Sequence, residues 1–177
     1  DSSALAEQVV QDVIASGFDS AGQRCSALRV LCLQEDIADH LLTLLRAALR
    51  ELRIGDPAHL ATDIGPVIDV TAKAGLEAHI AAMTQAGHRV YQCELSAACA
   101  AGVFVPPTLI EIDRIDALKG EVFGPVVHVL RYASDHLDAT VDAINAAGYG
   151  LTFGAHSRID DTLQQLVHRI QAGNVYI

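Results

Sequence analysis

Apolar residues recur at three- and four-residue spacing in several parts of the chain, as they do on one face of an amphipathic helix. The clearest example runs from Asp36 to Leu52, where Ile37, Leu41, Leu42, Leu45, Leu49 and Leu52 form one stripe. The same reasoning predicts helices over residues 3–16, 71–86, 137–147 and 160–170. Ser2 or Ser3 is the predicted cap of the first of these helices.

Short apolar runs separate these helices. Ala27–Leu33 is continuous and rich in strand-forming residues, so it predicts a buried strand. Further strands are predicted within residues 88–94, 102–112, 124–132, 151–157 and 173–177, and a Gly- and Pro-rich loop over residues 53–69. Alternating strands and helices favour an α/β fold of three layers, αβα, with a mostly parallel sheet. A single domain accounts for residues 1–177, and a strand signal at the very end suggests a piece of a longer polypeptide.

Composition narrows the class of protein. Hydrophobic residues make up 51% of the chain, but none of the apolar runs reaches the roughly 18 residues of a membrane span. The net charge of −10 argues against a nucleic-acid surface on this segment. The four cysteines form no C-x-x-C pair, which favours a reducing cytoplasm, and no His/Cys cluster has the spacing of a metal site.

Cys25 is the first candidate for chemistry. It follows "GQR" at residues 22–24, between a helix and a strand, where a turn could direct the sulfur into a cleft. A neighbouring cation or free backbone N–H groups favour the nucleophilic thiolate. The alternative, a small buried hydrophobic residue, has about equal weight. Ser26 is either a donor to a polar substrate or a turn serine. Cys32 is expected in the core, whereas Cys93 and Cys99 receive no role.

The second candidate is "EVFGPV", residues 121–126, where a loop enters a strand. Functional residues of α/β domains gather at such loop ends. On chemistry alone, Glu121 is a general base, an acceptor for hydroxyl groups or a solvated surface charge, and the last is the commonest for a lone glutamate.

Both motifs resemble those of one known family. "GQRCSA" is similar to the G-Q-x-C nucleophile signature of aldehyde dehydrogenases, and "EVFGPV" is similar to their E-x-F-G-P-V motif, in the same order. "GQRCSALRVLCLQED", "IGPVIDVTAKAGLEAHI", "GVFVPPTLIEID" and "NAAGYGLTFGAHSRID" resemble more closely the L-glutamate γ-semialdehyde (Δ1-pyrroline-5-carboxylate) dehydrogenase module of bifunctional proline utilization proteins. The resemblance covers essentially the whole chain.

This resemblance implies a nucleophile-bearing catalytic domain that oxidises L-glutamate γ-semialdehyde to glutamate with NAD, in proline catabolism. Cys25 matches the nucleophile, and Ser26 matches a contact on the substrate side. Glu121 matches the glutamate that binds the nicotinamide ribose hydroxyls, which displaces the general-base interpretation, and Phe123 matches the aromatic residue beside the nicotinamide ring. FAD is implied only if a proline dehydrogenase domain precedes this segment.

The family's general-base glutamate, its oxyanion asparagine and its NAD-binding domain match no part of this sequence, so the chain by itself is expected to be inactive. The expected partners are the aldehyde, the remainder of the parent polypeptide and, for that parent, further copies of itself. We expect a cytoplasmic protein whose other parts could associate with the inner membrane. The alternatives are a dehydrogenase for another semialdehyde, a cysteine hydrolase or thiol redox protein, and a silent homologous domain kept for assembly.

Overall fold

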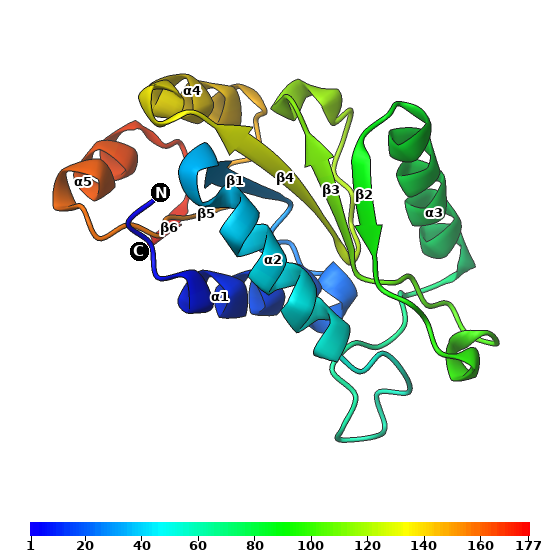
Figure 1. The fold of residues 1–177 in the computed structure, drawn as a ribbon. Helices are drawn as coiled ribbons and strands as arrows, with labels where there is room; N and C mark the ends of the chain where they lie inside the picture. The colour runs from blue at the N-terminus through cyan, green and yellow to red at the C-terminus, as the bar shows by residue number, and fades with distance from the viewer.

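The computed structural model describes all 177 residues and contains a four-stranded sheet with the strand order β1-β4-β3-β2 (Figure 1). The strands are β1 (Val30–Gln34), β2 (Arg89–Gln92), β3 (Thr108–Ile112) and β4 (Val126–Tyr132). β1, β4 and β3 are parallel, and β2 lies antiparallel to β3 at the edge. The predicted α/β fold with a mostly parallel sheet is therefore confirmed.

Helices cover both faces of this sheet (Figure 1). The helices are α1 (Ala6–Phe18), α2 (Glu35–Glu51), α3 (Val70–Gln85), α4 (Leu137–Ala146) and α5 (Asp160–Arg169). Neighbouring residues of a strand point to opposite faces. In β4, Val127 meets Gly17 of α1, whereas His128 meets His79 of α3. α1 and α2 thus form one outer layer and α3 the other.

The core lies between these layers and comprises 24 buried apolar residues. The stripe predicted on α2 is real, because Leu41, Leu42, Leu45 and Leu49 are all buried. β4 is buried on both faces, as expected for a central strand of a covered parallel sheet. Of the helices, none is long and apolar enough to cross a lipid bilayer.

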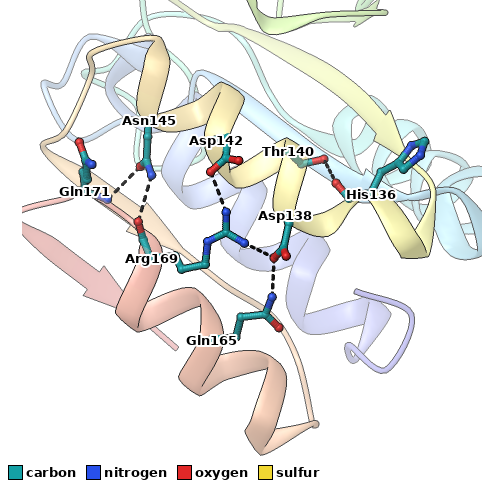
Figure 2. A network of polar contacts seen from close by, with 8 residues as sticks. All are labelled: His136, Asp138, Thr140, Asp142, Asn145, Gln165, Arg169 and Gln171. Atoms are coloured by element: carbon teal, nitrogen blue, oxygen red, sulfur yellow. Dashed lines mark hydrogen bonds and ion pairs between the residues drawn. The ribbon is translucent and has the colours of Figure 1, made fainter.

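A second, two-stranded parallel sheet pairs β5 (Thr152–Gly154) with β6 (Asn174–Tyr176). α5 connects these strands and is joined to α4 by polar contacts (Figure 2). Arg169 donates to Asp142 at 2.7 Å and pairs with Asp138. Asn145 donates from Nδ2 to the Arg169 carbonyl at 3.0 Å and accepts the Gln171 backbone N–H at 2.9 Å. These bonds fix the end of α5 against α4.

Two local predictions were wrong. Neither Ser2 nor Ser3 caps α1: the N-cap is Leu5, which makes no side-chain cap bond. Ser3 instead bonds through its hydroxyl to the Asp1 carboxylate and to the Arg158 backbone N–H, at 2.6 and 2.7 Å, so a long-range contact replaces the local cap. The first strand starts at Val30 and not at Ala27, because the Ala27 N–H closes a turn on the Arg24 carbonyl and the Leu28 N–H bonds to Ser16 of α1.

Candidate active site

The segment between α1 and β1 is a left-handed turn. After α1 ends at Phe18, Ser20, Ala21 and Gly22 have φ angles of 56°, 53° and 64°. This region costs a residue with a side chain about 1 kcal/mol or more, so the turn persists only where its surroundings hold it. Gln23 contributes to that support, because its Oε1 accepts the Ile68 backbone N–H at 2.8 Å. The glutamine of the motif thus joins the turn to the 53–69 loop.

Cys25 and Ser26 follow this turn, and both are exposed. The Cys25 backbone N–H donates no hydrogen bond within the chain. Both residues line a cleft of about 1750 Å³ whose wall also includes Glu121, Phe123 and, from the β6 side, Tyr176. The turn therefore presents a thiol and a free N–H donor side by side at an accessible surface, as nucleophilic chemistry requires.

Glu121 and Phe123 lie in the loop before β4 and meet the Cys25 turn through Arg29. The Glu121 Oε1 accepts from Arg29 Nε at 3.1 Å, and the Phe123 ring centroid lies 4.7 Å from the Arg29 Cζ, in cation–π geometry. Glu121 keeps 38% of its side chain exposed, and Phe123 is 44% exposed. Two motifs that start at residues 22 and 121 are therefore brought to one wall of the cleft.

Glu121 and Phe123 have the chemistry that a dinucleotide needs. Glu121 Oε2 has no bond to the protein, so a carboxylate oxygen remains to accept bonds from hydroxyl groups. Phe123 presents an exposed apolar ring that a flat heteroaromatic ring could pack against. These residues fit the ribose and nicotinamide parts of NAD.

The other cysteines are far less accessible. Cys32 packs against the core as predicted, and burial raises the pKa of its thiol to about 12. Cys99 is buried, and its sulfur lies 3.5 Å from the Ile54 carbonyl oxygen. Cys93 is half-buried, and burial raises the pKa of its thiol. None of the four forms a disulfide, and Cys25 alone is exposed.

The cation next to Cys25 in the sequence is engaged elsewhere. Arg24 donates through Nη2 to the carbonyls of Ala15 and Ser16, in the last turn of α1. A cation at a helix C-terminus complements the helix dipole. The arginine that joins the site residues is Arg29, which sequence reasoning missed. The only sequence feature that could have indicated Arg29 is its position as a single charged residue directly before the apolar run "VLCL".

His128 was missed in the same way, as a lone histidine within "VVHVL". It is buried, and its Nδ1 lies 3.2 Å from the Arg29 carbonyl oxygen. Its Nε2 lies 2.9 Å from Nε2 of His79 on α3. Because the carbonyl can only accept, His128 Nδ1 carries the proton and its Nε2 accepts from His79. Burial lowers the pKa of His128 to about 4, which keeps the ring neutral.

Comparisons with known proteins show the family and the fold to which this chain is similar. The bifunctional protein PutA of Klebsiella aerogenes is 59% identical over 182 residues, which cover all of this chain and 14% of the relative. The 1-pyrroline-5-carboxylate dehydrogenase of Geobacillus kaustophilus is 34% identical, over 99% of this chain and 34% of the relative. A crystal structure of a Bradyrhizobium japonicum proline utilization A (PutA) variant superposes with a TM-score of 0.94 at 48% identity, covering 99% of this chain and 18% of that one.

The chain thus spans 14% and 34% of the length of these two curated relatives. The model of the aldehyde dehydrogenase family matches residues 1–177. The chain belongs to the aldehyde dehydrogenase family.

Proposed function

We propose that residues 1–177 are the nucleophile-bearing catalytic domain of an NAD-dependent dehydrogenase that oxidises L-glutamate γ-semialdehyde to L-glutamate. The observation that carries this proposal is the convergence of exposed Cys25, Glu121 and Phe123 on one cleft. The high identity to PutA and the similarity to 1-pyrroline-5-carboxylate dehydrogenases support the choice of substrate.

The first step takes place on Cys25. Its Sγ, as thiolate, attacks the aldehyde carbon, and the carbonyl electron pair moves to the oxygen to give a thiohemiacetal oxyanion. The Cys25 backbone N–H, which donates to no group of the chain, is available to donate to that oxyanion. Ser26 follows Cys25 in the chain, is exposed and lines the same cleft, so it can donate to a polar group of the substrate.

Glu121 and Phe123 orient the cofactor. With NAD bound, the free oxygen of Glu121 would accept bonds from the ribose hydroxyls, and Phe123 would support the nicotinamide ring. Bound NAD would supply the acceptor for the hydride of the thiohemiacetal carbon, and loss of that hydride would leave a thioester on Cys25. Water then hydrolyses the thioester to the acid and frees the thiol. That water needs a general base.

Glu121 is not suited to be this base, because Arg29 binds one of its oxygens and the cofactor requires the other. The base, the oxyanion asparagine and the dinucleotide-binding fold are supplied by other parts of the complete polypeptide. The 177-residue chain by itself is therefore inactive. The complete polypeptide acts in the cytoplasm, and FAD belongs to the proposal only if a proline dehydrogenase unit is also present.

The test is an assay of NADH formation by the complete polypeptide that carries this sequence. L-Glutamate γ-semialdehyde should be oxidised with a higher kcat/KM than succinate semialdehyde, and the chain limited to residues 1–177 should show no turnover. A preference for succinate semialdehyde would instead support the alternative function, a dehydrogenase for another semialdehyde. Absence of any aldehyde oxidation by the complete polypeptide would favour a silent domain kept for assembly.

A further inference from the structure

Arg29 contacts the turn before Cys25 and both cofactor candidates, Glu121 and Phe123. Its Nη1 donates to the Gly22 carbonyl at 2.6 Å, its Nη2 donates to the Arg24 carbonyl at 2.9 Å, and its Nε donates to Glu121. Its guanidinium also lies over the Phe123 ring. All three guanidinium nitrogens have partners within the protein, and the side chain is only 17% exposed. A group so fully bonded is fixed in position.

We propose that Arg29 is a positioning residue that couples the cofactor contacts Glu121 and Phe123 to the turn that presents Cys25. The inference rests on the proposed roles of those three residues. Arg29 is not assigned a contact with substrate or cofactor. It acts through the backbone carbonyls of Gly22 and Arg24, which precede the nucleophile in the chain.

The shape of the turn supports this role. Gly22 is the third of three successive left-handed residues, so the backbone before Cys25 is strained and needs external bonds. Arg29 binds the carbonyls of Gly22 and Arg24, on either side of Gln23. The Arg24 carbonyl also accepts the Ala27 N–H at 3.1 Å, which closes the turn around Cys25. Without the guanidinium, the Gly22 carbonyl would lose its charged donor.

The backbone of Arg29 is itself anchored. Its carbonyl accepts the backbone N–H of His128 at 2.9 Å and faces the His128 ring Nδ1 at 3.2 Å. His128 is buried in β4 and bonded to His79 of α3. The sheet thus holds the Arg29 backbone in place. A displacement of Glu121 or Phe123 therefore moves the Arg29 side chain and, through it, the turn before Cys25.

A lysine could not replace this arginine. The planar guanidinium directs its donors along separate fixed directions, whereas an ammonium is a single point charge on a flexible stem. Arg29→Lys thus keeps the charge and removes the simultaneous bonds to Gly22, Arg24 and Glu121. The chain offers a matched control in Arg46, which pairs with Glu111 at 3.0 Å and lies 5.7 Å from the Tyr91 ring. None of those three residues lines the cleft.

The first arm of the test measures iodoacetamide alkylation of Cys25 by peptide mass spectrometry in the complete polypeptide, without substrate or NAD. Arg29→Lys should slow alkylation of Cys25 by about fivefold or more, because the turn relaxes and the sulfur no longer faces the cleft steadily. Arg46→Lys should leave the rate within about twofold of wild type, since it alters no bond of the turn. An unchanged or faster rate in Arg29→Lys would overturn the proposal.

The second arm measures coupling, which a merely structural residue would not produce. Glu121→Gln should change the Cys25 alkylation rate by about threefold in wild type and by much less when combined with Arg29→Lys, because the signal passes through Arg29. Full additivity of the two substitutions would refute the coupling. If Arg29→Lys fails to fold, Glu121→Gln alone decides, and an unchanged Cys25 rate in that variant counts against the proposal.

The third arm separates this inference from the proposed function. In the NAD-dependent assay, Arg29→Lys should raise the KM for NAD and lower kcat, whereas Arg46→Lys should change neither. If wild type oxidises no aldehyde, the proposed function fails, and the alkylation arms still decide the role of Arg29.

Discussion

Gly22 and Gly124 lie backbone against backbone, one from each of the two motifs at the site. A Cβ placed on Gly22 would lie 2.2 Å from the Gly124 carbonyl oxygen, and a Cβ placed on Gly124 would lie 2.4 Å from the Leu76 side chain. Gly22 therefore allows the close approach that brings the Cys25 turn against the loop of Glu121 and Phe123, whereas Gly124 leaves room for Leu76 of α3 to pack on that loop. The geometry explains why both motifs contain a glycine at these positions.

Substitution of Gly22 is expected to be costly. Gly22→Ala forces a side chain into a left-handed residue and against a carbonyl oxygen, so it should lower the free energy of unfolding by at least about 2 kcal/mol. Chemical denaturation of the purified protein measures this loss. Gly87→Ala is the matched control, because φ is +89° there and the added methyl group meets open space. A loss no larger at Gly22 than at Gly87 would show that the Gly22–Gly124 contact is unimportant.

Glu121 provides a test of the cofactor assignment. Glu121→Gln should raise the KM for NAD about tenfold or more in the complete polypeptide, because hydrogen bonds to a charged group contribute about 1.5–3 kcal/mol. Initial rates at varied NAD measure this effect. Glu111 does not line the cleft, so Glu111→Gln, which weakens its ion pairs with Arg46 and Arg131, should lower stability and leave the KM for NAD unchanged. Equal NAD kinetics in wild type and Glu121→Gln would remove Glu121 from the cofactor site.

The pair formed by buried His128 and partly buried His79 predicts a dependence of stability on pH. Burial lowers the pKa of His128 from 6.5 to about 4 and also lowers the pKa of His79. Between pH 6.5 and 4 the unfolded chain therefore binds more protons than the folded one, so stability is full above pH 6.5 and falls as the pH drops toward 4. The lowered pKa of His128 reduces the free energy of unfolding by on the order of 3 kcal/mol between pH 6.5 and 4.

Thermal unfolding across this pH range measures the effect. His128→Gln should flatten the decline in Tm between pH 6.5 and 4, whereas His40→Gln, at an exposed position on α2, should keep the wild-type slope. An identical slope in wild type and His128→Gln would mean that the ring is not buried in its neutral form.

The contacts of Figure 2 predict where α5 opens first. Asn145 binds the Arg169 carbonyl and the Gln171 N–H, so Asn145→Ala should speed amide exchange in the last turn of α5 by about tenfold, as the loss of about 1–2 kcal/mol implies. Hydrogen–deuterium exchange followed by peptide mass spectrometry measures this change. Gln164→Ala on the exposed side of α5 is the control. Equal protection in both variants would show that Asn145 does not hold the helix.

The sequence predicted the elements that depend on local pattern. The stripe on α2 and the buried run of β4 follow from period and composition alone, and their observed bounds agree within a few residues. The place of Cys25 between two elements left two interpretations open, and the structure favours the exposed one. Such features are encoded within a single segment of the chain, where spacing and side-chain type are sufficient.

The features that were missed depend on contacts between distant segments. Arg29 and Glu121 are 92 residues apart, and no local pattern pairs them. The cap predicted at Ser3 was wrong because its hydroxyl binds Arg158, 155 residues away. Ser20 and Ala21 have left-handed backbone angles although neither is a glycine, so the sequence does not indicate this conformation. Contacts with other segments, and not local propensity, hold them there.

The central claim is that the Cys25 sulfur attacks the aldehyde, and its most direct test is to trap the acyl group. The complete polypeptide is mixed with L-glutamate γ-semialdehyde and NAD and quenched in acid within one turnover. The masses of its cysteine-containing peptides are then measured by mass spectrometry. We expect the acyl mass on the Cys25 peptide alone, and neither an adduct nor NADH in Cys25→Ala. An adduct on Cys32, Cys93 or Cys99, or undiminished NADH formation by Cys25→Ala, would contradict the account.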